Sequence, residues 1–313
     1  MRILLAGATG TIGSALVPQL LSAGHSVLGL TRNPAGAERL AGLGVRPVIA
    51  DMMNADALLA AVAGLRADAV VHQATALTRT PTRHRDLYAT DALRDEGTRN
   101  LLRAARIVGA ERFVTQSFFL GYGWKDHGST PLTEDRPFAQ LGRGPYDRHL
   151  RSLRSNEDQV LGFGGIALRY GLFYGPEQST FGLMDSLRRR KLPVPRHASN
   201  LHPIHIADAA AATVAALERG RPGQAYNIAD DEPVDMGDYL DALAAIAGAP
   251  APRRVPGWLL RATPYLHGLL VGTHIRLDTT EARRELGWTP QYPTYRDGFA
   301  ALDTTSAPAH RTQ

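Results

Sequence analysis

A short glycine-rich segment near the start of the chain carries the clearest chemical signal. Residues 7–13 read GATGTIG, directly after an apolar run at 3–6 that is typical of a buried strand. Between a strand and a helix, such glycines allow a tight turn, a close approach to a pyrophosphate, and close packing of the helix. The helix N-terminus attracts the phosphates. We therefore predict a dinucleotide-binding loop, with contacts from Gly7, Thr9, Gly10, Thr11, Ile12 and Gly13.

The residue after the second predicted strand bears on the choice of cofactor. That strand covers 26–31, and Arg32 follows it, 19 positions after Gly13. Proteins that prefer NAD place an acidic residue at about 20 positions on, where it binds the ribose 2′-hydroxyl. Here no acid occurs before Glu38. Because a guanidinium attracts a 2′-phosphate, we expect NADP(H) to be favoured over NAD(H).

Other cofactor contacts are expected where further strands end, because ligands of α/β sheets bind outside the carboxyl ends of the strands. Asp51 ends the third predicted strand, and an acid there can accept a hydrogen bond from an adenine amine. Its alternative role is to cap the following helix. The remaining expected contacts at these ends are Met52, Gln73, Ala74 and Thr75.

The elements that must position these residues alternate regularly. The predicted buried strands are 3–6, 26–31, 46–50, 69–73, 112–116 and 166–170. The predicted helices lie near 11–23, 35–43, 54–64, 85–108 and 146–162. Strands that alternate with helices indicate an α/β fold, here a Rossmann doubly wound parallel sheet with helices on both faces.

The second half of the chain is less regular and predicts a smaller substrate lobe. Helices are expected near 178–190, 206–218, 235–248, 256–271 and 278–285, and a strand at 224–228 rejoins the main sheet. We therefore expect a dinucleotide-binding domain made of 1–175 and 202–232, a C-terminal substrate lobe made of 176–201 and 233–302, and a disordered tail at 303–313.

Composition narrows the class of protein. Lysine and arginine exceed the acids by 35 to 30, but the one dense basic run, 188–191, reads as a solvated helix end or an anion-binding rim. We therefore expect no nucleic-acid partner. Cysteine is absent, which excludes disulfides and thiolate nucleophiles, and no spacing supports a metal site. No apolar run reaches the roughly 18–20 residues of a membrane span, and no signal peptide follows Met1. We expect a cytoplasmic location without membrane contact.

Several motifs, taken with the glycine-rich loop, give the chain a family resemblance. They are VVHQAT (70–75), RFVTQS (112–117), LRYGLFYGP (168–176), HPIHIADAAAA (202–212) and AYNIADDEPV (225–234). The chain resembles the extended and atypical short-chain dehydrogenase/reductase superfamily, of the NAD-dependent epimerase/dehydratase type. The resemblance implies a cleft between the two lobes and cofactor contacts at Leu172 and Phe173. It also implies a homodimer through the helices that match 85–108 and 146–162.

The proton relay of that superfamily is not matched. The resemblance implies a Ser or Thr after the fifth strand, and a Tyr-x-x-x-Lys on the next helix in which the Lys lowers the Tyr pKa. Alignment on the neighbouring residues places Phe118, His149 and Leu153 at these positions. Gly121 and Leu187 lie four residues before the only two lysines, so no Tyr-x-x-x-Lys exists in the chain. Lowering a Tyr pKa from about 10 to about 7 takes about 4 kcal/mol, which no lysine supplies at this helix.

Four residues are candidates for the replacement chemistry: His149, Tyr146, Tyr122 and Ser117. Histidine titrates near neutral pH without help, so His149 can take the place of the Tyr, if it is not simply a partly exposed helix residue. Tyr146 begins the same predicted helix and can swing inward. Tyr122 and Ser117 follow the fifth strand, at the usual rim of an α/β site.

Three functions stay open on these residues. The first is an NAD(P)(H)-dependent oxidoreductase that acts on a small organic carbonyl or alcohol without the Tyr-Lys relay. The second is a redox-neutral epimerase, isomerase or dehydratase that retains its cofactor. The third is a non-catalytic sensor of NADP(H). Aromatic residues in the long segment 117–145, among them Phe118 and Trp124, favour an apolar or aromatic small-molecule substrate, unless they only pack the segment.

Overall fold

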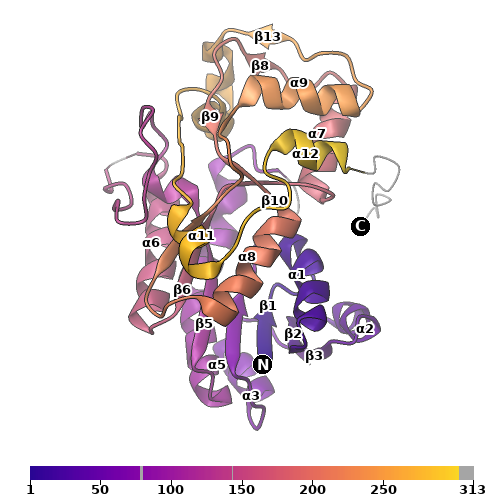
Figure 1. Ribbon diagram of the computed structural model, residues 1–313, viewed down its shortest axis with the longest axis vertical. Helices are drawn as coiled ribbons and strands as arrows, with labels where there is room; N and C mark the ends of the chain where they lie inside the picture. The colour runs from indigo at the N-terminus through magenta and orange to yellow at the C-terminus, as the bar shows by residue number, and fades with distance from the viewer. Residues whose placement is uncertain (78–79, 143, 303–313) are drawn as a thin grey trace.

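The computed structural model describes residues 1–77, 80–142 and 144–302, and among these residues seven parallel strands form the central sheet (Figure 1). Its order is β11-β6-β5-β4-β1-β2-β3, so successive strands are added on one side of β1 up to β3 and on its other side from β4 onward. A reversal of strand order of this kind opens a crevice at the carboxyl ends of the strands, where α/β proteins bind ligands. The strands are β1 (Arg2–Ala6), β2 (Ser26–Thr31), β3 (Arg46–Ile49), β4 (Ala69–His72), β5 (Arg112–Phe118), β6 (Ile166–Tyr170) and β11 (Ala225–Ile228).

Helices cover both faces of this sheet, which confirms the predicted Rossmann α/β fold. The strands β1, β2, β4 and β6 are rich in buried Val, Ile, Leu or Ala, as strands covered on both faces require, whereas the edge strand β3 buries only Val48. One face packs against α1 (Thr11–Ser22), α2 (Pro34–Gly42), α8 (Ile206–Arg219) and α11 (Thr280–Leu286). The other packs against α3 (Ala55–Val62), α5 (Thr98–Val108) and α6 (Asp147–Gly162).

A separate apolar core belongs to the smaller lobe, which lies at the carboxyl ends of the main strands (Figure 1). Its helices are α7 (Gln178–Arg188), α9 (Met236–Ile246), the 3₁₀ helix η4 (Gly257–Ala262), α10 (Pro264–Leu270) and α12 (Tyr295–Ala300). Three short strand pairs join it: β7 (Leu172–Tyr174) with β10 (Pro203–His205), β9 (Asn200–Leu201) with β12 (Val234–Asp235), and β8 (Val194–Pro195) with β13 (Arg254–Val255). The residue boundaries proposed for the two lobes stay a prediction, and the tail predicted at 303–313 lies outside the described residues.

Two predicted helices are broken in the structure. The helix expected at 256–271 becomes η4 and α10, because Pro264 lacks an N–H and starts a new helix. The helix expected at 85–108 becomes the 3₁₀ helix η1 (His84–Leu87), α4 (Tyr88–Ala92), the π-helix η2 (Leu93–Gly97) and then α5. A π-turn rotates the side chains before it relative to those after it, and such turns are frequent at functional sites.

The long segment expected between β5 and α6 contains the 3₁₀ helix η3 (Phe119–Tyr122), which continues directly from β5. No helix in the described ranges is long and apolar enough to cross a membrane.

Candidate active site

The glycine-rich loop forms a cradle that only glycine backbones can make. Gly7 has a φ of +87°, and a Cβ there would lie 2.6 Å from the backbone of Gln73. A Cβ on Gly13 would collide with the carbonyl oxygen of Gly7. Gly10 precedes α1 without a side-chain cap, and the first turn of α1 contains no acidic residue. The N–H groups at this helix end therefore stay available for a phosphate, as a dinucleotide requires.

The residues predicted to recognise the adenosine end lie beside this cradle, at the ends of β2 and β3. Arg32 is exposed, and the described residues offer its guanidinium no hydrogen-bond or ion-pair partner. Asp51 is exposed and accepts a hydrogen bond from Met53 N at 2.9 Å. Asn54, rather than Asp51, caps α3 through Ala57 N, so the capping alternative for Asp51 is wrong. Met52 is buried in the core between the sheet and the helices α3 and α5.

A largely apolar cavity of about 200 Å³ extends from the cradle to the smaller lobe. Thr11 and Ile12 of α1 line it at the cradle, together with Gln73 and Thr75 after β4. Leu172 and Phe173 of β7, both predicted cofactor contacts, line it as well. Side chains of α7, α9 and α10 complete its wall. A pocket that is apolar with a few polar groups is the usual form of a small-molecule site.

His149 lines this cavity and is 1% exposed. Its Nδ1 lies 2.8 Å from Asp91 Oδ2, and its Nε2 lies 3.0 Å from Nδ1 of His84. A carboxylate only accepts hydrogen bonds, so Nδ1 of His149 carries a proton and Nε2 is the acceptor when the ring is neutral. His84 then donates from Nδ1. Burial, and next the neighbouring His149, lower the pKa of His84 below its usual value.

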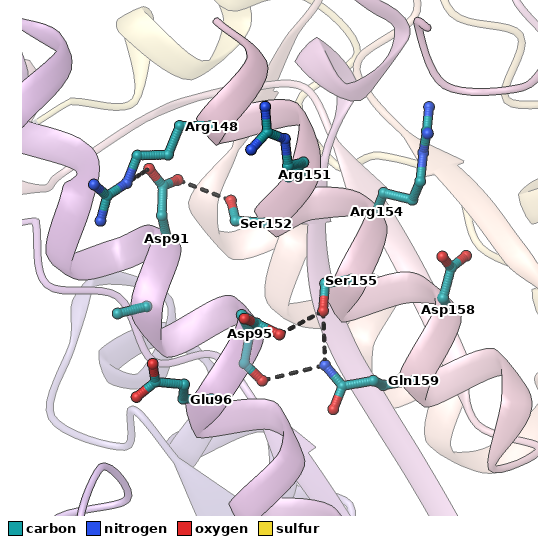
Figure 2. A pocket seen from close by; sticks show the side chains of 11 residues that line it. Asp91, Asp95, Glu96, Arg148, Arg151, Ser152, Arg154, Ser155, Asp158 and Gln159 are labelled. Carbon is teal, nitrogen blue, oxygen red and sulfur yellow. Dashed lines mark hydrogen bonds and ion pairs between the residues drawn. The ribbon is translucent and has the colours of Figure 1, made fainter. Parts of the chain in front are cut away.

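Asp91 connects His149 to a second, open groove on the other side of α4 and α6. Figure 2 shows its carboxylate between Ser152 and Arg148, with Ser152 Oγ donating to Oδ1 at 2.8 Å. Arg148 Nε lies 3.6 Å from Oδ2. The carboxylate itself is buried, so these contacts hold it toward His149. The homodimer expected through these helices concerns the same surface and stays a prediction.

Comparison with known proteins agrees with this fold. The model of the NAD dependent epimerase/dehydratase family matches residues 3–229. The chain belongs to this family.

Three proteins illustrate how the chain relates to others. It is 36% identical to a 3-diazoavenalumate denitrifying reductase from a Streptomyces species, over 96% of this chain and 99% of that one. It is 26% identical to a 4-hydroxy-2-methyl-3-oxo-4-farnesyl-3,4-dihydroquinoline-1-oxide ketoreductase from Stigmatella aurantiaca, over 96% of each. Its fold is similar to a dTDP-glucose 4,6-dehydratase from Bacillus anthracis in complex with NAD, with a TM-score of 0.74 and 20% identity, over 96% and 94% of the two chains.

Ser117 and Tyr122, two of the four catalytic candidates, do not appear among the described residues that line the cavity of this family member. Ser117 Oγ donates to Glu157 Oε1 at 2.5 Å, and Glu157 pairs with Arg169 at 2.8 Å. Arg169 donates to the Tyr122 hydroxyl, which in turn lies 3.0 Å from Asn227 Oδ1. Burial raises the pKa of Tyr122 to about 12. In place of the expected substrate contact, both hydroxyls belong to a buried network that joins β5, α6 and β6.

Tyr146 also lies outside the described cavity wall. It precedes α6, stacks on Trp124 with ring centroids 4.6 Å apart, and donates to the carbonyl oxygen of Pro264 at 3.2 Å. Burial raises its pKa. By contrast, Phe118, His149 and Leu153 all line the cavity. The positions at which the family resemblance expects a proton relay therefore face one space, and His149 is the titratable group among them.

Sequence reasoning missed Asp91, His84 and Arg94, which complete the surroundings of His149. Asp91 lies 58 positions and His84 65 positions from His149, so no local spacing links them. All three residues fall in or just before 85–108, which the sequence predicts as one uninterrupted helix. Charged residues occur throughout 85–108, so nothing in the sequence distinguishes Asp91 and Arg94 from the residues of a solvated helix face.

Proposed function

We propose that the protein is an NADP(H)-dependent reductase of small apolar or aromatic compounds, in which His149 replaces the usual Tyr-Lys relay. The observation that carries this proposal is a single apolar cavity that extends from the glycine cradle to His149. Support comes from the two relatives described above, which are both named reductases, with a diazo-substituted carboxylate and a quinoline oxide in their names. Neither name contains a sugar nucleotide.

The residues present fit the cofactor of the family. The cradle at Gly7, Gly10 and Gly13 would hold the pyrophosphate, and Arg32 the 2′-phosphate that distinguishes NADP from NAD. Asp51 would accept from the adenine amine. Leu172 and Phe173 would pack beside the nicotinamide at the cavity wall. When bound, the reduced nicotinamide supplies a hydride.

His149 is positioned to supply the proton that must accompany the hydride. Asp91 fixes the proton of its Nδ1, so the transferable proton resides on Nε2 when the ring is charged. Asp91 also stabilises that charged ring, as a carboxylate does for other catalytic histidines. In the structure Nε2 faces His84. We therefore propose that a substrate oxygen replaces His84 Nδ1 as the partner of His149 Nε2 during turnover.

The apolar wall has two consequences for the reaction. Phe118 and Leu153 occupy positions where the superfamily has polar groups, so a substrate packed against them would leave little room for water. Exclusion of water strengthens every charge interaction in the site. It also favours aromatic and aliphatic substrates over hydroxyl-rich ones, because a sugar would lose its hydrogen bonds to water on entry.

One experiment tests the proposal. The purified protein is supplied with NADPH and a panel of aryl ketones, quinone-like compounds and diazo compounds, and loss of the reduced-cofactor absorbance is followed together with the products. We expect reduction of at least one class with equal consumption of NADPH. A product formed without net consumption of cofactor would indicate a redox-neutral isomerase or dehydratase instead. Binding of NADPH without turnover of any class would favour a sensor.

A further inference from the structure

Arg94 is a buried cation whose N–H groups make no hydrogen bond to any described residue. It belongs to η2, lines the cavity and is only 8% exposed. The described residues give its guanidinium no hydrogen bond. Its one ion pair is with Asp91, at an NH1–Oδ1 distance of 3.8 Å, which exceeds hydrogen-bond length. Five N–H donors in an apolar space are therefore left without an acceptor.

The distant contact with Asp91 does not account for the burial of the Arg94 guanidinium. Its carboxylate already accepts hydrogen bonds from His149 Nδ1 and Ser152 Oγ, both at 2.8 Å, and Arg148 approaches it from the groove. Burying an arginine without hydrogen bonds is costly, since guanidinium groups in protein interiors are normally paired. Burial accordingly lowers the pKa of Arg94, although an arginine keeps its charge in proteins.

The other charged groups of the cavity wall are fully engaged. Glu177 accepts from Ser179 N, Thr180 N and Thr180 Oγ1, so its carboxylate caps α7 and does not neutralise Arg94. Arg94 is the only arginine or lysine among the described residues that line the cavity. The described wall of the cavity therefore offers one planar, monovalent cation that has a distant ion pair with Asp91 and no hydrogen bond.

We propose that Arg94 binds the carboxylate of an apolar acid, which makes the preferred substrates of this enzyme small aryl or alkyl carboxylates. The planar fork of a guanidinium matches a carboxylate through two parallel hydrogen bonds. A phosphate dianion would need further donors, and the apolar wall supplies no second cation.

This inference rests on the proposed function only in treating the bound acid as a substrate. Binding of the acid can be measured without turnover. Trp124 lines the same cavity, so its fluorescence reports occupancy. The probes are 3-phenylpropanoate and its neutral amide, 3-phenylpropanamide, titrated into the full chain saturated with NADP⁺. We expect the wild-type protein to bind the acid at least roughly 30-fold more tightly than the amide, as for a charge pair in a desolvated pocket. That comparison needs no variant to fold.

Variants then assign the preference to Arg94. In Arg94→Gln, and in Arg94→Met if the glutamine variant fails to fold, we expect the preference for the acid to vanish while amide affinity changes little. Arg151→Gln is the matched control, because Arg151 lies on the exposed face of α6 and does not line the cavity. It should retain the full preference for the acid.

The outcomes separate this inference from the proposed function. Equal affinity of the wild-type protein for acid and amide, or a preference that survives in Arg94→Gln or Arg94→Met, overturns the role of Arg94. If neutral ketones are reduced but acids show no advantage in binding, the reductase proposal stands and this inference fails. If the acid preference depends on Arg94 but no compound is reduced, the anion site is supported and the reductase proposal fails.

Discussion

Replacement of His149 by Asn separates its chemical role from its structural one. Asn Nδ2 is the same number of bonds from the backbone as His Nδ1, so it can donate to Asp91 Oδ2 as His149 does at 2.8 Å. The variant lacks any group at the place of Nε2. His149→Asn should therefore retain the anchor and lose the proton donor.

The size of the effect follows from these contacts. A positioned general acid contributes roughly 10²–10⁴-fold to rate, so we expect kcat of His149→Asn to fall by this factor. Its unfolding free energy should change by no more than about 1 kcal/mol, because Asp91 keeps its hydrogen bond. His149→Ala leaves the buried Asp91 carboxylate short of one donor, and should cost about 1–3 kcal/mol more in stability.

Steady-state kinetics with the best ketone and NADPH give kcat and KM, and nucleotide fluorescence gives the Kd for NADPH. We expect the loss in kcat alone, with Kd unchanged because His149 is not part of the cradle. His127→Asn serves as the control, since His127 contacts Gly123 O outside the described cavity wall. Wild-type kcat in a folded His149→Asn would refute the proposed proton donor.

Three further changes test the cofactor site and the buried histidines. Arg32→Ala should weaken NADPH binding by roughly 10- to 100-fold and leave NADH binding unchanged, because only the 2′-phosphate contact is lost; an equal effect on both would contradict the cofactor preference. Gly13→Ala should abolish binding of either nucleotide in calorimetry, because its Cβ meets the Gly7 carbonyl, whereas Gly42→Ala, whose Cβ meets nothing, should bind normally. Burial lowers the pKa of His202 from 6.5 to about 4, so its neutral form stabilises the fold above pH 6.5 and that stability is lost as the pH falls toward 4. Relative to His202→Gln, the wild-type protein should lose about 3 kcal/mol of unfolding free energy between pH 7 and pH 4 in denaturant titrations; a constant difference would show that His202 protonates equally in both states.

The strands of the main sheet could be predicted from the sequence because each is a short, continuous apolar run. The break in the helix expected at 85–108 could not be predicted, because a π-turn depends on how η2 packs against α6, and no residue type marks it. Pro264 did mark the break between η4 and α10. The π-turn mattered more for function, since Asp91 and Arg94 lie on either side of its start.

Among the catalytic candidates, too, the sequence predicted residue types and positions, whereas tertiary packing decided which side chains face the cavity. Ser117 and Tyr122 have the right residue types near the right strand end, but both hydroxyls point into the core. Alternation along β5 turns Ser117 toward Glu157, and in η3 the Tyr122 hydroxyl accepts a hydrogen bond from Arg169. His149 was found through its register on the helix with Leu153 and Glu157. Its partners came from segments that the chain brings together only on folding.

The sequence by itself determined the cofactor cradle, because all of its parts lie within seven consecutive residues and depend on backbone geometry that only glycine permits. It also determined that no Tyr-x-x-x-Lys exists. Only the tertiary structure decided which residues surround the positions where that motif is missing. The reason is that burial, and not residue type, determines whether a polar side chain finds a hydrogen-bond partner within the protein. Burial joined His149 to Asp91 and His84, and it left the guanidinium of Arg94 at an apolar cavity with no hydrogen bond to the described residues.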